Sequence, residues 1–245
     1  MRAATTRGGT ARRATEVRDP ILVVQRTQGI RVRTIAVAFA FAFVLAAPAG
    51  AFVDSGSGCP ESVERTPAVE PIAWRDSVAV GTPSAGRLVR GVRLAPGRAG
   101  FFTWDPVERR RPNRAWRRWG TDRLVRIVLR VVREYAAAHP NAPRVGIGDL
   151  SRPRGGPFGP KHASHQNGLD IDVYYPRLDR RERPPRRVEQ IDRRLAQDLV
   201  DRFVRAGAEI VYVGPSTGFT GPSGVVQVLW NHDNHLHARF GAKTD

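Results

Sequence analysis

Apolar residues recur at helical spacing in two segments of the chain. In the first, Thr121 occupies the position of a helix cap and Pro140 follows the end, so a helix is predicted from Thr121 to about Ala138. A second helix is predicted from about Arg187 to Ala206, where Gly207 ends it. The positions predicted to be buried are Leu124, Val128, Val131 and Tyr135 in the first helix, and Val188, Ile191, Leu195, Leu199 and Phe203 in the second.

Shorter apolar stretches predict strands. They lie at residues 86–94, 144–149, 169–174, 209–213, 225–230 and 236–240. Strands of this length combined with two helices indicate an α+β fold, in which a small and mainly antiparallel sheet has both helices packed on one side.

The N-terminal segment has the pattern of an export signal. A basic stretch ends at Arg33, and the residues from Thr34 to Ala47 are uncharged and mostly apolar, with small residues around Pro48 that fit a cleavage site. This apolar run is short for a membrane span, which needs about 20 residues, and an uncleaved anchor is the alternative. We expect a signal peptide at 1–51, a flexible linker at 52–76 and a folded domain at 77–245. That domain would be periplasmic or extracellular, with no stable membrane insertion after cleavage.

Charge and cysteine content narrow the classes of partner and site. The formal net charge is +17, but residues 1–33 contain eight arginines against Glu16 and Asp19, so the rest of the chain carries +11. A basic domain suits a polyanion such as an anionic cell wall. Nucleic acid is not expected as a partner, because the chain has no recognised binding motif and an export signal contradicts it. Cys59 is the single cysteine, which excludes an intramolecular disulfide and a zinc–thiolate structural site.

Five of the six histidines fall in two short segments. The first segment, residues 161–172, contains His162 and His165 and ends in Asp170 and Asp172. The second, residues 231–240, contains the other three: His232, His235 and His237. Histidine is the commonest protein ligand for metals, and a carboxylate often completes such a site. Either cluster alone fits surface metal affinity as well as catalysis, but the two together predict one shared ion and an enzyme.

Strand geometry indicates how the two clusters meet. Side chains two residues apart on a strand share a face, so Asp170 and Asp172 point the same way, as do His235 and His237. If these strands pair, an aspartate and a histidine meet across the sheet, and a turn through Gly168 can fold His165 back over them. Two imidazoles and one carboxylate then form an open site of the catalytic zinc type. Asp170 fits either a cap at the sheet end or a support for a ligand histidine.

The motifs resemble those of the penicillin-insensitive murein endopeptidases, within the wider group of lysostaphin-type, D-Ala-D-Ala-cleaving and sonic-hedgehog-like metal domains. The segments that carry the resemblance are VGTPSAGRL (80–88), GDLS (148–151), RGGP (154–157), HASHQNGLDID (162–172) and WNHDNHLH (230–237). The resemblance spans about 77–239. It implies a zinc metallopeptidase that cleaves the D-alanyl to meso-diaminopimelyl cross-link of peptidoglycan without a covalent intermediate, so that β-lactams do not inhibit it.

The resemblance also implies roles for individual residues. The zinc ligands would be His165, Asp172 and His237, and His235 would be the base or the group that stabilises the oxyanion. His162 and His232 would line the site and position water or substrate. Asp170 and Ser164 are expected to support the ligands.

Two alternatives to the endopeptidase remain open. One is a D,D-carboxypeptidase or dipeptidase that trims uncrosslinked stem peptides. Those relatives carry a serine two residues before the first zinc histidine, where this chain has Ala163. The other is a metal-containing wall-binding module without catalysis, although every candidate catalytic position is occupied here. The chain also departs from better-known members in lacking paired cysteines and in carrying arginine-rich loops at 108–118 and 177–187.

Overall fold

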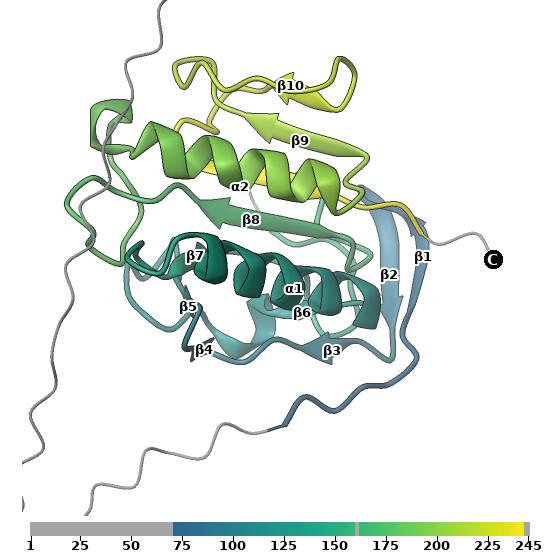
Figure 1. Cartoon of the computed structure of the whole chain (residues 1–245). Helices are drawn as coiled ribbons and strands as arrows, with labels where there is room; N and C mark the ends of the chain where they lie inside the picture. Colours follow the sequence, from purple (N-terminus) through teal and green to yellow (C-terminus); the bar gives the residue numbers. More distant parts are fainter. Residues whose placement is uncertain (1–70, 160–161, 243–245) are drawn as a thin grey trace, which may run out of the picture. The chain divides into compact units, whose positions relative to one another are not determined.

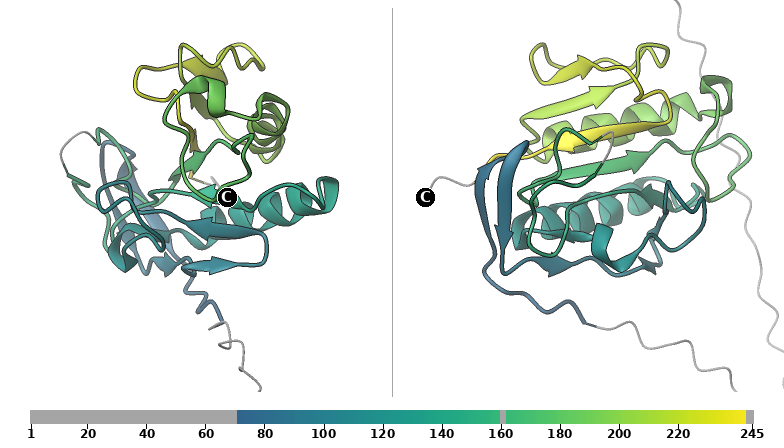
Figure 2. Two further views of the ribbon diagram at one scale, coloured as in Figure 1. Left: turned by 90° about the vertical axis from the view of Figure 1, so that its left-hand side faces the viewer. Right: turned by 180° about the vertical axis from the view of Figure 1, so that it is seen from behind.

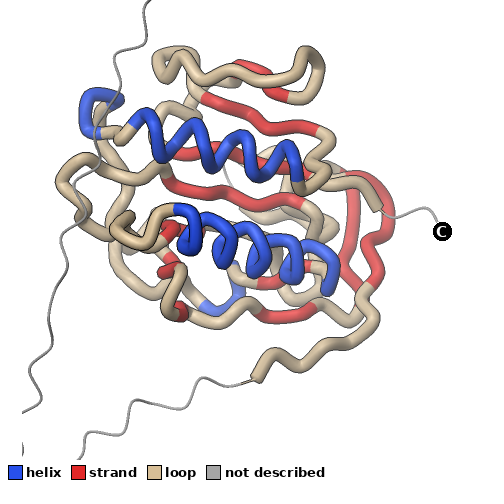
Figure 3. Tube along the Cα trace, viewed as in Figure 1, coloured by secondary structure: helices blue, strands red, loops and turns tan. Residues whose placement is uncertain are grey.

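A central seven-stranded sheet organises the chain. The computed structural model describes residues 71–159 and 162–242, and the expected signal peptide and most of the expected linker lie outside them. In spatial order the strands are β10 (Val226–Val228), β9 (Ile210–Val213), β11 (His235–Arg239), β8 (Asp170–Tyr174), β7 (Val145–Ile147), β5 (Phe101–Thr103) and β4 (Gly97–Arg98). The pairs β10–β9 and β5–β7 are parallel and the other pairs antiparallel. The expected α+β class with a mainly antiparallel sheet is confirmed (Figures 1 and 3).

The two helices lie on the same face of this sheet, as predicted (Figure 1). Helix α1 (Asp122–Ala138) begins where expected, because the Thr121 side chain accepts a hydrogen bond from the backbone N–H of Leu124. Helix α2 (Arg193–Arg205) begins later than the predicted Arg187. The predicted start is wrong because Asp192 provides the cap, accepting from the Leu195 N–H, and the preceding residues form a 3₁₀ turn at Val188–Gln190.

The prediction of one continuous strand at 86–94 is also wrong. It is split into β2 (Ala85–Val89) and β3 (Val92–Arg93), with Arg90 between them at φ +50°. Strand β2 forms a hairpin with β1 (Val78–Thr82), while β3 pairs with β6 (Trp119–Gly120). A short 3₁₀ helix, Ala115–Arg117, precedes β6 within the first arginine-rich loop.

Strands β8 and β11 have one apolar and one polar face. Their alternate residues Ile171, Val173, Leu236 and Ala238 are completely buried in the core that the helices cover. Burying a side chain such as Ile or Leu stabilises the fold by about 1.5–3 kcal/mol. The intervening residues therefore point to the other face of the sheet, which Figure 2 (right) shows from the side away from the helices. Asp170, Asp172, His235 and His237 all belong to this second set.

The β1–β2 hairpin anchors the glycine- and proline-rich loop that precedes the first histidine cluster. The Leu88 N–H donates to the carbonyl of Arg154, and the Gly156 N–H donates to the carbonyl of Gly86. This contact requires glycine at 155, which has φ +69° and would place a Cβ atom 2.0 Å from the backbone oxygen of Gln166. The hairpin thus fixes the path of the chain toward His165.

No membrane-crossing helix is found among the described residues: neither α1 nor α2 combines the length and the apolar character that a span requires.

Gly155→Ala should destabilise the protein more than Gly156→Ala. Both glycines have left-handed backbones, but a Cβ at Gly156 would meet nothing within 4 Å. We expect about 1 kcal/mol of left-handed strain from Gly156→Ala and a loss several times larger from Gly155→Ala, where backbone must also move. Thermal unfolding of both variants measures the difference, and equal melting temperatures would contradict the close approach at Gly155.

Candidate metal centre

The predicted pairing of the two motif strands is confirmed. Strands β8 and β11 run antiparallel, with His237 opposite Asp172, Arg239 opposite Asp170 and His235 opposite Tyr174. The Nδ1 atom of His237 lies 3.1 Å from an Asp172 oxygen. A histidine and an aspartate from segments about sixty residues apart thus meet on the polar face of the sheet.

His165 reaches the same point from the loop before β8. Its backbone has φ +68°, a strained conformation for a residue other than glycine, and its carbonyl accepts a hydrogen bond from the Ser151 hydroxyl. The ring Nδ1 lies 2.6 Å from the carbonyl oxygen of Leu150, which fixes Nδ1 as the protonated nitrogen. The other nitrogen, Nε2, lies 3.4 Å from Asp172.

These three residues form a set with the chemistry of a metal site. One ligand atom from each of His165, Asp172 and His237 lies within 4.8 Å of the others, and all three residues are buried. Two imidazole nitrogens and one carboxylate oxygen are a donor set that zinc accepts in catalytic sites. Each histidine also has its second nitrogen held by a protein acceptor, which is typical of ligand histidines.

Asp170 supports two of the three candidate ligands. One carboxylate oxygen is 2.9 Å from Nε2 of His237 and 2.9 Å from Nε of Arg239, and the other accepts from the backbone N–H of His165 at 3.0 Å. Burial acts to raise the pKa of Asp170, but hydrogen bonding to His237 and the nearby positive groups lower it. Asp170 is therefore ionised, and it occupies the supporting position that the sequence left as one of two alternatives.

The electrostatics of the three candidate ligands are strongly coupled. Burial alone would lower the pKa of His165, but the carboxylate of Asp172 raises it to about 9. Burial likewise opposes ionisation of Asp172, yet His165 and His237 hold its pKa well below the usual range. The site thus favours a positive charge beside Asp172, and a metal ion that displaces the histidine protons would supply such a charge.

His235 and His232 stand beside this centre. The Nε2 atom of His235 lies 3.8 Å from Asp172, and its Nδ1 lies 2.6 Å from the side-chain oxygen of Asn234. Burial lowers the pKa of His235 to about 4, so its imidazole is neutral at physiological pH. His232 stacks on His235 with ring centroids 4.7 Å apart, and burial also lowers its pKa.

His162 also lines the cavity, with its ring centroid 5.5 Å from that of His165. Its Nε2 lies 3.2 Å from Asp149, and its ring packs 4.7 Å from that of Phe158. Asp149 also forms a buried two-bond ion pair with Arg117, at 2.6 and 2.5 Å. Asp149, His162 and Asp172 form a second group with ligand atoms in range of one another, but the pair with Arg117 already engages Asp149.

Three contributors were missed by the sequence interpretation. Asp149, Arg117 and Asn234 each hold a residue of the site through its side chain. Asp149 lies inside the GDLS motif and Asn234 directly precedes His235, so both were visible as neighbours of motif residues. No local pattern marks Arg117, which reaches Asp149 from 32 residues away.

The candidate ligands open into a cavity of about 670 Å³. Its lining contains all five clustered histidines as well as Asp172 and Asp149, and Ser164 and Ala163 lie on its wall. Ser164 is buried beside His165. Aromatic residues from β8, β9 and the loop before β11 also line the cavity: Tyr174, Tyr212 and Trp230. The cavity admits a peptide-sized ligand to the candidate metal centre.

Comparison with known proteins agrees with the resemblance seen in the motifs. No curated protein matches the chain. The family model of the penicillin-insensitive murein endopeptidases matches residues 79–207, which is more than half of the chain and contains His165, Asp170 and Asp172. The match ends before His235 and His237, and the pairing of β11 with β8 brings these two residues to the matched segment. The chain belongs to the penicillin-insensitive murein endopeptidase family.

Proposed function

We propose that this protein is an exported, zinc-dependent murein endopeptidase that hydrolyses the D-alanyl to meso-diaminopimelyl cross-links of peptidoglycan. The observation that carries the proposal is the convergence of His165, Asp172 and His237 in a buried cluster that opens into a peptide-sized cavity. Membership of the family supports peptidoglycan as the substrate. Export is supported by the apolar N-terminal segment, which lies outside the described residues.

The donor set fits zinc. His165 would bind through Nε2, because Leu150 holds its Nδ1, and His237 would bind through Nδ1, because Asp170 holds its Nε2. Asp172 lies between them and supplies the negative charge. When bound, zinc supplies Lewis-acid activation of the scissile carbonyl and of the attacking water.

His235 is suited to act as the general base. Its Nδ1 proton is held by Asn234, so the lone pair of Nε2 faces the centre and can take up the proton that the attacking water releases. The low pKa that burial causes keeps this nitrogen unprotonated at neutral pH. His232 stacks on the His235 ring, and His162, which contacts Asp149, would position substrate or water.

Asp170→Asn should weaken zinc binding about 10- to 100-fold, which is the usual effect of removing a partner of a ligand histidine. Asp170 accepts from His237, Arg239 and His165, and an amide in its place offers an NH₂ group to at least one of these donors. Chelator competition measures the affinity. Asp201→Asn is the matched control, because Asp201 lies on α2 and bonds to Gln197. Unchanged affinity in Asp170→Asn would contradict the supporting role.

Variants of the histidines should separate metal binding from turnover. His165→Ala and His237→Ala should lose both zinc and activity, because each removes one of three ligand side chains. His235→Ala should retain zinc and lose about 10²–10⁴-fold in kcat, the contribution typical of a general base. Metal content by mass spectrometry and single-turnover assays give the two readouts. A fully active His237→Ala protein would sink the assignment of ligands.

Purified muropeptide dimers test the reaction itself. We expect the protein to convert cross-linked dimers to monomers and to lose this activity when a chelator removes the metal. Mass spectrometry of the products identifies the bond. Release of a terminal D-alanine alone would instead indicate a carboxypeptidase, and intact dimers with zinc-loaded protein would indicate a wall-binding module.

A further inference from the structure

A second cavity adjoins the candidate metal centre. Its volume is about 730 Å³, and it shares five lining residues with the metal cavity. The shared residues are Pro106, Tyr174, Trp230, Asn231 and Asn234. A ligand that occupies the metal cavity can therefore extend into the second one without leaving the surface of the protein.

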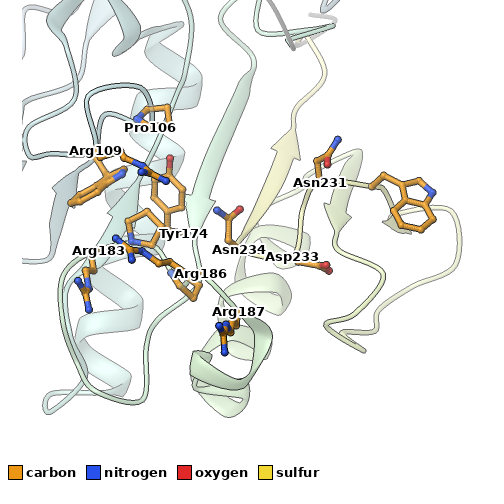
Figure 4. A pocket seen from close by; sticks show the side chains of 13 residues that line it. Pro106, Arg109, Tyr174, Arg183, Arg186, Arg187, Asn231, Asp233 and Asn234 are labelled. Carbon is orange, nitrogen blue, oxygen red and sulfur yellow. The ribbon is translucent and has the colours of Figure 1, made fainter.

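Four arginines line this second cavity, which we call the arginine cavity. Arg109 comes from the first arginine-rich loop, and Arg183, Arg186 and Arg187 come from the second. In Figure 4 these four side chains lie on one side of the pocket, and Asn231 and Asp233 lie on the other. The loops that matched no motif in the sequence thus meet in space beside the candidate metal centre.

The four arginines have no ion-pair partner among the residues that the structure describes, whereas their neighbours do. Arg110 pairs with Glu108, Arg177 pairs with Asp179, and Arg111 pairs with Glu182. The Nε atom of Arg183 is buried without a hydrogen-bond partner in that same part of the chain. A buried donor without a partner costs about 1–3 kcal/mol, and no acceptor in that part of the chain offsets this cost at Arg183.

Two ion pairs of Glu182 connect the second arginine-rich loop with Arg111 of the first loop and with Arg144. Glu182 lies next to Arg183 and binds Arg111 of the first loop and both Nε and Nη2 of Arg144, the latter two at 2.6 Å. The acid on the cavity wall, Asp233, is engaged by the N–H and hydroxyl of Ser216, each at 2.9 Å. The paired residues therefore fix the loops, and the cavity keeps an excess of positive charge.

Apart from the arginines, Asn231, Asp233 and Asn234, the wall is apolar or aromatic. It includes Trp104, Pro184, Pro185 and Trp230, and Trp230 is 78% exposed at the border with the metal cavity. Apolar walls lower the local dielectric constant and strengthen the attraction between a guanidinium and an anion. Arginine is also the side chain that binds carboxylates with two parallel hydrogen bonds.

We propose that the arginine cavity binds the free carboxylates of the murein stem peptide while its cross-link lies at the metal centre. The inference rests on the proposed function, because that function places a carboxylate-rich peptide in the adjoining cavity. In the proposed cross-link, the diaminopimelyl residue keeps a free carboxylate next to the scissile amide nitrogen. The arginine cavity then selects substrates by the charge of this residue, and it discriminates against dimers in which the carboxylate is amidated.

The test compares binding of two substrates to three proteins. Cross-linked muropeptide dimers with free or amidated diaminopimelyl carboxylates are titrated calorimetrically into the metal-depleted full chain, and KM and kcat are measured with zinc. The test variant is Arg109→Gln, Arg186→Gln and Arg187→Gln combined, because these three side chains are exposed. The matched control is Arg130→Gln, Arg133→Gln and Arg194→Gln combined, which removes the same charge from exposed positions on α1 and α2.

The wild type should bind the free-carboxylate dimer at least about tenfold more tightly than the amidated dimer, which is the effect of one lost charge-assisted contact. The test variant should bind both dimers with equal affinity, and its KM for the free-carboxylate dimer should rise about tenfold. The control variant should retain the preference for the free-carboxylate dimer. If the test and control variants lost equal affinity for the free-carboxylate dimer, the effect would come from the net positive charge of the protein, and the proposal would be overturned. Cleavage without any preference would overturn the arginine cavity alone, whereas preferential binding without cleavage would support the cavity and overturn the endopeptidase.

Discussion

The buried carboxylate of Asp170 is the interaction on which the candidate site depends. It is fully buried, and it remains ionised because three donors from two segments of the chain converge on it: the backbone N–H of His165 and the side chains of His237 and Arg239. Removing one of these donors would leave part of the buried negative charge uncompensated in a low-dielectric environment. Asp170 therefore fixes the strained backbone of His165 and the ring of His237 at once, and both rings then face Asp172.

The same two strands build the core and the site. Residues of β8 and β11 alternate between the helix-covered core and the polar face, so a one-residue slip in their register would turn Ile171 and Leu236 toward the polar face and Asp172 toward the apolar core. Hydrophobic packing thereby specifies which carboxylate lies opposite which histidine. Gly148 shows how tightly this face is packed, since a Cβ atom there would lie 3.1 Å from that of Asp172. The geometry of the centre is thus set by the energetics of folding.

Patterns with a short period were predictable from the sequence, and contacts between distant loops were not. The alternation of Asp170 with Asp172 and of His235 with His237 predicted the polar face, and Thr121 predicted the start of α1. The apolar spacing of Val188 and Ile191 misled the prediction for α2, because both residues pack toward the core before the α-helix begins, and only Asp192 marks the cap. Strand β5 is too short for periodicity to reveal, and Arg117 meets Asp149 only through the tertiary fold.

Charge pairing, and not total charge, gives the arginine-rich loops a specific role. A net charge of +17 indicates attraction to polyanions without indicating where they bind. The structure divides the arginines into two groups with different effects. Arg111, Arg114, Arg117 and Arg144 are neutralised by acids that connect the loops with each other and with the domain, and Arg177 pairs with Asp179 within its own loop. Arg109, Arg186 and Arg187 have no such acid among the described residues and face the arginine cavity. The paired arginines hold the backbone of the loops. Binding an anion at the remaining guanidinium groups therefore costs less conformational entropy of the loops. In this way a basic composition gives a binding site at one place on the protein.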